Sequence, residues 1–389
     1  MGSRTKQINY TMKLFSACAI VLVVVGHIPS TGFNGPFDMF KPYSFQVASF
    51  VFVSGYFYKE ANESHPVAYL GSRIKRLLIP LIAINAAYGC IVALLKRAVG
   101  IEWGGVLSVQ SLLVMPFTDG HQFLINMPMW FIAPLFFAEI GNVAIRLCVK
   151  RIPSSSFKEV LLASVYLALG AVAIHCGGDE GLPSGLLLLM CRSLFFLACL
   201  GMGRCYAVVL EKYDTLPNVP FFAILFTLQL AVIVALHGRY TYIPSWCQFP
   251  AGILGTYFVT ITGIAFLLRC CKLLAPAFGR SRFVAALADN TFSIMCHHIF
   301  GFFLVCSLFG LLSMATPYFA SFDYSAYLSD WTYRWMPEAV PQTSLVYVSG
   351  GIFVSLVIHW GWVRIKGRWQ KIWSSLINKR CRAQKNIGQ

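Results

Sequence analysis

The sequence is short of charge, and acidic residues are especially few. Only 12% of its 389 residues are charged, with 15 Asp and Glu against 31 Lys and Arg. A soluble domain of this length would need far more polar surface to stay in solution. Hydrophobic residues make up 57% of the chain and recur in long blocks from end to end. These features exclude a soluble globule and predict an all-α, polytopic integral membrane protein.

Several well-known site motifs are also missing. The chain contains no GxGxxG, Walker loop, GxSxG or HExxH pattern, which argues against dinucleotide, P-loop, serine-hydrolase and zincin sites. Its 13 cysteines show no CxxC or Cys/His spacing that would predict a metal site. Cys176 and Cys247 both fall near the predicted outer surface and are candidates for a disulfide. We expect no metal and no tightly bound cofactor.

The hydrophobic blocks predict about ten transmembrane helices. Most of the 31 Lys and Arg fall in alternate connections, which places both termini in the cytoplasm by the positive-inside rule. Residues 1–363 then form the membrane domain, and residues 364–389 form a basic tail that meets anionic lipid headgroups. The basic charge thus reflects membrane orientation rather than nucleic-acid binding. The ten predicted spans are Met12–Ile28, Tyr43–Tyr58, Leu77–Leu95, Met127–Cys148, Phe157–His175, Ser184–Gly203, Val219–Leu236, Phe249–Arg269, Ala285–Ser313 and Thr343–Val363.

Ionisable residues inside these spans are the first candidates for a functional site, because burying them in a membrane is costly. His27 is the one ionisable side chain in the apolar run Leu14–Ile28. Arg192 lies deep in the sixth span, and Glu139 of the fourth span is an available partner for it. His298 follows another histidine in the ninth span. Adjacent residues point about 100° apart on a helix, so the two histidines do not form a shared metal site.

A basic cluster marks the predicted cytoplasmic entry to the third span. Arg73, Lys75 and Arg76 fall within four residues. They are explained either as a topology anchor or as a site for an anion such as the phosphates of coenzyme A. Ser54 and Gly55 form a small notch near the same surface, either for close helix packing or for a ligand.

Aromatic residues are concentrated toward the predicted outer surface. The loop from Met314 to Gln342 contains Trp331 and Trp335 among several tyrosines and acids, a composition suited to stacking on sugar rings. An interfacial aromatic belt explains these residues almost as well. Trp130, at the start of the fourth span, is most simply a belt residue.

Taken in order, these segments resemble the membrane-bound acyltransferase-3 family, and most closely its members that O-acetylate surface polysaccharides. Each match is short, but together they run from the first span to the ninth. They are Val-Val-Val-Gly-His27; Phe52-Val53-Ser54-Gly55-Tyr56; Arg73-Ile74-Lys75-Arg76-Leu77 with Pro80; Met129-Trp130-Phe131; Arg192 ahead of Phe195, Phe196 and Gly201; and Asn290-Thr291-Phe292-Ser293-Ile294 leading to His298.

The resemblance implies an acyl-coenzyme A donor on the cytoplasmic side and a glycan hydroxyl reached from the outer side. By this analogy His27 is the essential histidine of the first helix. Many members carry an arginine at the position of Ser16, and Lys13, one turn earlier, is the candidate to replace that cation. The resemblance also implies a multi-pass protein of the plasma (inner) membrane whose partners are acetyl-coenzyme A, a glycan and lipids.

The chemistry assigns roles to these residues. Transfer of an acyl group from a thioester to a hydroxyl needs a base for the proton and a donor for the carbonyl oxyanion. We expect His27 to be the base, Arg192 to stabilise negative charge, and His298 to orient His27 or relay the proton. Donor binding is expected from Lys13, Ser54, Arg73, Lys75 and Arg76, and acceptor binding from Trp130, Trp331 and Trp335.

Three alternatives remain open at this stage. His27 could instead carry the acyl group in a covalent intermediate. The same polar residues would also suit a proton-coupled transporter or exporter of a small polar or glycan substrate. The third alternative is a structural membrane subunit in which these polar groups only pack.

Overall fold

The computed structural model describes residues 8–28, 39–317, 321–335 and 344–387 of the chain, with side chains up to residue 370. These residues form helices and irregular connections, and their strand-like pairings are two isolated bridges. In chain order the helices are α1 (Tyr10–Gly26), η1 (Pro42–Ser44), α2 (Gln46–Tyr56), α3 (Ala61–Ser64), α4 (Pro66–Arg73), η2 (Ile74–Leu78), α5 (Ile79–Val99), α6 (Val109–Leu113), α7 (Met115–Thr118), η3 (Leu124–Phe131), α8 (Ile132–Cys148), α9 (Ser156–Gly177), α10 (Gly185–Cys205), η4 (Tyr206–Leu210), η5 (Glu211–Tyr213), α11 (Asn218–Ala235), η6 (Pro244–Trp246), α12 (Gly252–Phe278), α13 (Arg282–Asp289), α14 (Thr291–Ala315), α15 (Tyr324–Ser329), α16 (Trp331–Trp335) and α17 (Ser344–Ile387).

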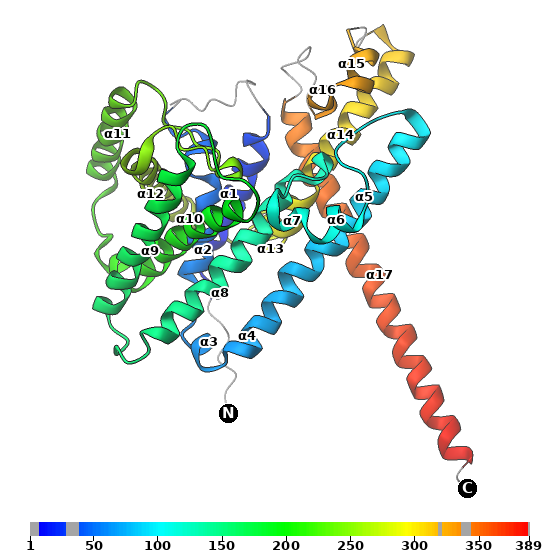
Figure 1. The fold of residues 1–389 in the computed structure, drawn as a ribbon, viewed down its shortest axis with the longest axis horizontal. Coiled ribbons are helices and arrows are strands. Elements are labelled where there is room, and N and C mark those ends of the chain that lie inside the picture. The colour runs from blue at the N-terminus through cyan, green and yellow to red at the C-terminus, as the bar shows by residue number, and fades with distance from the viewer. Residues whose placement is uncertain (1–7, 29–38, 318–320, 336–343, 388–389) are drawn as a thin grey trace.

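Ten of these helical segments correspond to the ten predicted spans. Eight are long and apolar enough to cross a membrane, and α1 and α2 are shorter apolar helices. The 17 residues of α1 give a rise of about 25 Å, which nearly matches the hydrocarbon core. The protein is therefore an all-α, multi-pass membrane protein, as the sequence predicted. Figure 1 shows that α1 begins and α17 ends toward the same side of the bundle.

Three boundaries differ from the prediction. The fourth span begins with η3, which is kinked at Asn126 and contains Pro128. The ninth begins at Thr291 rather than Ala285, because Asn290 leaves the helical conformation and separates α13 from α14. The last span does not stop before the basic segment, since α17 continues as one helix to Ile387 and extends away from the bundle (Figure 1).

Helix α1 lies inside the bundle, which explains why it is apolar on all sides. It packs against α2, α12, α13, α14 and α17. A helix that is hydrophobic all round is normally buried in this way. His27 caps the C-terminus of α1, and Lys13 lies near its start. We use "the His27 end" and "the Lys13 end" for the two ends of the bundle below.

The crossing of α2 and α10 depends on two glycines. A Cβ atom on Gly55 would lie 1.9 Å from the carbonyl oxygen of Leu200, and one on Gly203 would lie 1.9 Å from that of Phe52. Glycine is therefore required for the two backbones to approach this closely. The contact fixes α10, which carries Arg192, and it explains the notch at Gly55 as helix packing.

Candidate active site

His27 lies where α1 ends, and it is only partly buried. Its backbone N–H closes the last turn of the helix on the carbonyl of Val24, 3.2 Å away. Its imidazole therefore stands at the boundary between the buried helix and the connection that follows. The ring approaches three other aromatic rings, with centroid distances of 4.9 Å to His298, 5.9 Å to Trp335 and 6.5 Å to Tyr43.

A chain of hydrogen bonds defines the tautomers of the two histidines. His298 Nδ1 lies 2.8 Å from the carbonyl oxygen of Ile294, which can only accept, so Nδ1 carries the proton and Nε2 has a lone pair. His27 Nδ1 lies 2.7 Å from the carbonyl of Val23 and 3.3 Å from His298 Nε2. Because both are acceptors, His27 Nδ1 is the donor. His27 Nε2 is left with a free lone pair, as a general base requires.

The other histidine of the pair does not reach this site. Nδ1 of His297 lies 2.8 Å from the hydroxyl of Tyr88 on α5. His298, by contrast, is fully buried and faces His27 on α1. The two rings thus face different helices, as the helical geometry predicted.

Two tryptophans of α16 line the approach to His27. The rings of Trp331 and Trp335 lie 5.4 Å apart, and Trp331 is exposed. The indole N–H of Trp335 is buried and has no hydrogen-bond partner among the described residues. An aromatic face with an unused donor is suited to a ligand that offers both a ring and an oxygen atom. Residues 318–320 and 336–342 of the aromatic loop lie outside the described residues.

Arg192 is buried at the same end of the bundle, but its predicted partner is wrong. It does not contact Glu139. Its Nε and NH1 atoms donate to the backbone carbonyls of Ser245 (2.9 Å) and Asp119 (2.8 Å), and NH2 also binds Ser245. The guanidinium lies over the ring of Trp130, 5.2 Å from its centroid. Three of its five N–H donors are therefore held by carbonyls, and no carboxylate pairs with it among the described residues.

Trp130 belongs to a buried aromatic stack and not to a lipid-facing belt. It is 7% exposed. The imidazole of His121 stacks on Trp246, with centroids 4.2 Å apart, and lies 6.5 Å from Trp130 on its other side. His121 and Trp246 were not among the site residues predicted from the sequence. The one feature that could have indicated His121 is its position just ahead of the Met129-Trp130-Phe131 motif.

Burial sets the charge state of this stack. Burial lowers the pKa of His121, although its contact with Asp119 acts in the opposite direction. The hydrogen bond from His121 in turn lowers the pKa of the Asp119 carboxyl. A neutral His121 adds no repulsion to a proton that His27 takes up.

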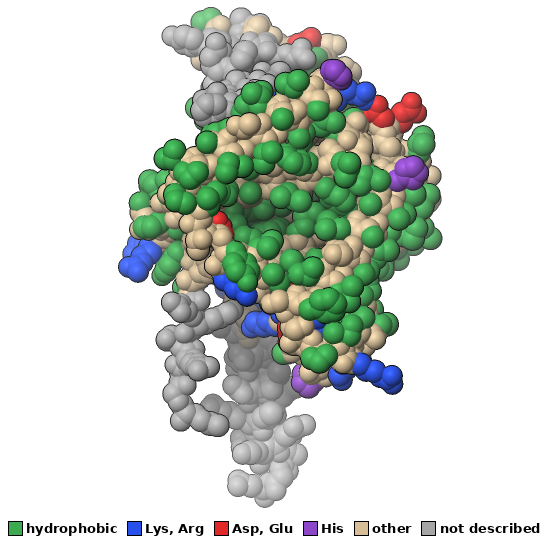
Figure 2. Space-filling view, turned by 90° about the vertical axis from the view of Figure 1, so that its left-hand side faces the viewer, with side chains coloured by type: hydrophobic (Ala, Val, Ile, Leu, Met, Phe, Trp, Pro, Cys, Tyr) green, Lys and Arg blue, Asp and Glu red, His purple; other side chains and the backbone are tan. Residues whose placement is uncertain are grey.

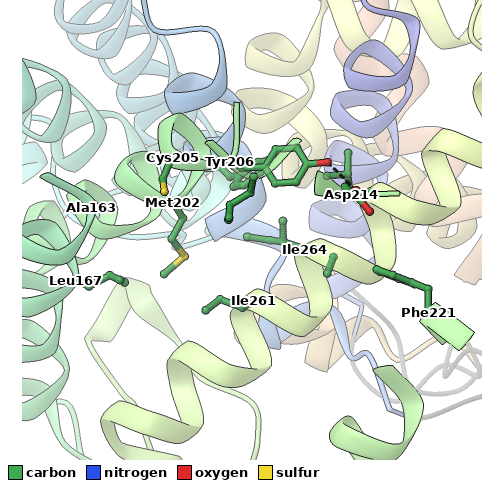
Figure 3. Close-up of a pocket in the computed structure, with 13 residues that line it drawn as sticks. Ala163, Leu167, Met202, Cys205, Tyr206, Asp214, Phe221, Ile261 and Ile264 are labelled. Carbon is green, nitrogen blue, oxygen red and sulfur yellow. Dashed lines mark hydrogen bonds between the residues drawn. The ribbon is translucent and has the colours of Figure 1, made fainter. Parts of the chain in front are cut away.

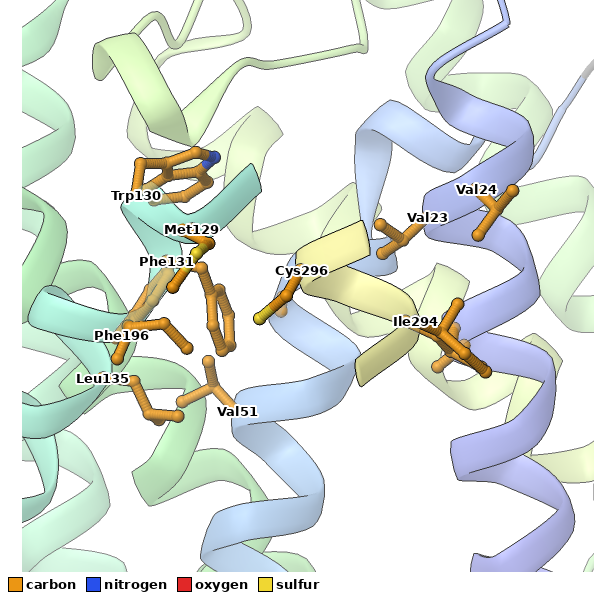
Figure 4. Close-up of a cluster of buried hydrophobic side chains, with 14 of the residues drawn as sticks. Val23, Val24, Val51, Met129, Trp130, Phe131, Leu135, Phe196, Ile294 and Cys296 are labelled. Carbon is orange, nitrogen blue, oxygen red and sulfur yellow. The ribbon is translucent and has the colours of Figure 1, made fainter. Parts of the chain in front are cut away.

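Figure 4 shows how the two groups are separated. The segment of α14 that carries Ile294 and Cys296 lies between α1, with Val23 and Val24, and η3, with Trp130. Helix α14 therefore contributes His298 on one side and packs against η3 on the other. The predicted catalytic residues thus form two neighbouring groups, His27 with His298 and Arg192 with Trp130.

The basic cluster occupies the Lys13 end, and one of its cations has a carboxylate partner. Arg73 Nε lies 3.1 Å from Glu139 Oε2, and its guanidinium covers the ring of Tyr69. Lys75 and Arg76 are exposed on η2, a π-helical turn. Such turns are frequent at functional sites. Within the described part of the chain the two exposed cations form no ion pair, whereas Arg73 is tied to α8 by Glu139.

The two remaining donor-site candidates are also at this end. Lys13 Nζ forms an ion pair with Asp289 Oδ2 at 3.2 Å. The hydroxyl of Ser16 donates to the carbonyl of Met12 and so stays within its own helix. Ser54 is partly exposed on α2. Lys13 is therefore the charged group of this helix face, as expected, but it is already paired.

The structure offers no metal centre in its described part. No group of three His, Cys, Asp or Glu residues could hold an ion there. Cys176 and Cys247 are free thiols, the first exposed and the second buried.

Comparison with protein families gives a direct assignment. Residues 9–322 match the model of the acyltransferase domain named Acyl_transf_3. The chain belongs to the acyltransferase-3 family. No curated protein and no solved structure matches it. The matched region runs from the start of α1 through α14, so this acyltransferase has both histidines of its candidate site within the family domain.

Proposed function

We propose that this acyltransferase is an O-acyltransferase that moves an acyl group, namely acetyl, from acyl-coenzyme A to a hydroxyl of a cell-surface or lipid-linked glycan. The observation that carries the proposal is the free lone pair of His27 Nε2. It results from the chain that runs from Ile294 through His298 to His27 Nδ1. A base whose other nitrogen is fixed in this way is ready to take a hydroxyl proton.

The proposed reaction uses the two neighbouring groups together. His27 Nε2 accepts the proton of the acceptor hydroxyl while its oxygen attacks the thioester carbonyl. The carbonyl of Val23 and the Nε2 atom of His298, both beside Nδ1, then stabilise the imidazolium. The two donors of Arg192 that carbonyls leave unused stabilise the oxyanion. When the C–S bond breaks, His27 returns the proton to the coenzyme A thiolate, and the ester remains on the acceptor.

The acceptor is proposed to lie against the tryptophans of α16. Sugar rings stack on aromatic faces, and Trp335 offers an unused N–H donor beside His27. Trp331 extends this surface outward. Trp130 contributes indirectly in this proposal, because it covers Arg192.

The donor is proposed to enter from the Lys13 end, which is the cytoplasmic end in this proposal. Lys75 and Arg76 are exposed there and would bind phosphates. Lys13, Arg73 and Ser54 complete the donor side. The rise of α1 from Lys13 to His27 is about 21 Å, so the donor's extended arm must cross most of the bundle. This arrangement supports a protein of the plasma (inner) membrane with both termini in the cytoplasm.

Labelled acetyl-coenzyme A tests the proposal. Membrane vesicles with the wild-type protein should transfer label to glycan, and His27→Ala should reduce the rate by about 10²–10⁴-fold. His297→Ala is the matched control, because this neighbour bonds Tyr88 outside the site. Label that still enters glycan with His27→Ala would reject the role of His27. Glycan movement without consumption of acetyl-coenzyme A would favour the transporter alternative.

A further inference from the structure

A cavity separate from the histidine site opens on the side of the bundle formed by α9, α11 and α12. It has a volume of about 310 Å³. Phe52, Leu167, Met202 and Ile264 are among its apolar lining residues, and Figure 3 shows the side chains of α9, α10 and α12 turned toward one another around it. Its size is that of a small-molecule site, although its lining is almost entirely apolar.

The cavity opens to the lipid-facing surface. Ile261 lines it and is 51% exposed, and Leu210 lines it and is 50% exposed. Figure 2 looks at this side of the molecule and shows a hollow within a broad hydrophobic surface. Helix α11 borders it loosely, because Leu225 and Gln229 are the buried residues of that helix.

The end of the cavity nearest the Lys13 end is polar. Asp214 and Tyr206 line it, with the tyrosine hydroxyl 2.8 Å from Asp214 Oδ2. Lys272 Nζ donates to the same carboxylate oxygen at 2.6 Å and to the tyrosine hydroxyl at 2.9 Å. Arg269 also pairs with Asp214 and covers the ring of Phe221, another lining residue.

This polar end holds two cations around one carboxylate. Arg269 and Lys272 both pair with Asp214, whereas Glu211, the other carboxylate near Tyr206, accepts from the hydroxyl of Tyr56. The Arg269 side chain is 8% exposed, and its Nε has no hydrogen-bond partner among the described residues. The Lys272 side chain is 28% exposed, so its ammonium group is accessible. A buried unpaired N–H beside an accessible cation calls for an anionic oxygen atom.

We propose that this cavity binds one acyl chain of an anionic phospholipid, whose phosphate group lies beside Lys272 and Arg269. An apolar cavity of this kind does not hold water stably. Its opening meets the hydrocarbon region of the bilayer, so a lipid chain enters without leaving an apolar environment. The accessible ammonium of Lys272 and the unpaired Nε–H of Arg269 then select a negatively charged headgroup.

The competing occupant is the acyl chain of a long-chain acyl-coenzyme A. The phospholipid is favoured because the opening faces the bilayer laterally, and because the donor-site cations Lys75 and Arg76 lie on η2, which does not line the cavity. The proposal does not depend on the reaction assigned to His27.

Lipid analysis of the full-length protein tests this site. After extensive exchange into detergent, the wild type should retain about one phospholipid per chain, which matches a single site of this volume. Ala265→Trp fills the cavity and Lys272→Gln removes its accessible cation, and each should release most of that lipid. Leu254→Trp, at an exposed position of the same helix, and Lys59→Ala, an exposed lysine elsewhere, should retain it.

A binding measurement covers the case in which Ala265→Trp fails to fold. Adding phosphatidylglycerol to delipidated wild type should raise its Tm by about 2 °C, whereas phosphatidylcholine should raise it less, and Lys272→Gln should abolish the difference. Equal retention by the cavity and control variants would overturn the proposal. Recovery of acyl-coenzyme A in place of phospholipid would overturn it as well. If His27→Ala abolishes glycan labelling but still retains the lipid, then lipid binding at this cavity does not depend on the proposed reaction.

Discussion

Arg146 and Arg192 are equally buried, yet their surroundings are opposite. Each is 1% exposed. Arg146, near the Lys13 end, donates to both carboxylate oxygens of Glu159, at 2.9 and 2.6 Å, and to the amide oxygen of Asn142. A second carboxylate, that of Glu63, lies 3.6 Å away. Arg192, near the His27 end, has carbonyls and a tryptophan ring as its partners.

The difference separates a structural cation from a functional one. Carboxylates neutralise Arg146, which thereby ties α8 to α9. Carbonyl dipoles orient Arg192 without cancelling its charge. The Asp119 carboxylate is near Arg192 but does not form an ion pair with it among the described residues, and a buried charge without a direct ion pair is costly and marks a functional position. The net positive charge of Arg192 is available to an anion that forms only during the reaction.

The largest effect is expected from Arg146→Ala. This change leaves the buried Glu159 without its main partner, so we expect a loss of about 3–5 kcal/mol of stability. Thermal unfolding in detergent measures it. The double variant Arg146→Met with Glu159→Leu should recover much of the loss, because the two most closely paired buried charges leave together and Arg204 keeps its ion pair with Glu60. An unchanged Tm for Arg146→Ala would contradict a structural role for the pair.

Arg192→Lys should show the reverse pattern. Lysine keeps the charge but cannot reproduce the planar set of donors, so we expect acyl transfer to fall by about 10²–10³-fold. The Tm should fall less than in Arg146→Ala. Labelled acetyl-coenzyme A and thermal unfolding, measured on both variants, give the comparison. The comparison would fail if Arg192→Lys lowered the Tm as much as Arg146→Ala and its folded fraction kept a normal kcat. Both arginines would then be structural.

The contrast between these arginines also shows what sequence can predict. The helices were predictable because each apolar block carries its own signal. His27 and Arg192 were predictable because one ionisable residue stands out in such a block. The pairing of Arg192 with Glu139 was wrong, because partners depend on which helices touch. The carbonyls that hold Arg192 come from two connections, and a backbone carbonyl has no sequence signature.

The other wrong or absent predictions also concern tertiary contacts, which the sequence of a single segment does not show. Trp130 lies at the start of a span, where an aromatic belt is expected, but the direction of its side chain is set by the kinked η3. His121 lies outside the apolar blocks, so its position beside Trp246 was not visible in sequence. The start of the ninth span was placed too early because α13 is amphipathic and continues the apolar pattern up to Asn290.

A smaller effect is expected from His298, which acts through His27. His298→Ala removes one of the two acceptors of His27 Nδ1–H and leaves the carbonyl of Val23, and we expect a loss of about 10–100-fold in transfer. His298→Gln keeps an oxygen acceptor and should retain more activity than His298→Ala. The readout is the pH profile of kcat, which should move in the alanine variant because its imidazolium at His27 loses a stabilising partner. Equal activity and unchanged profiles in both variants would mean that His298 only packs.

The smallest effect concerns the pH dependence of stability through His121. Burial lowers its pKa in the folded protein, so the unfolded chain binds more protons below about pH 6.5. This group therefore contributes a loss of stability as the pH falls through that range. Asp119 also loses its contribution to stability on acidification, but its pKa is lowered from 3.8, so this loss occurs at more acidic pH.

We expect the Tm of His121→Asn to fall less than that of the wild type between pH 7 and pH 5. His237→Asn, at an exposed histidine, is the control. Parallel Tm curves for wild type and His121→Asn would show that this histidine, unlike Arg192, contributes no charge effect at the His27 end.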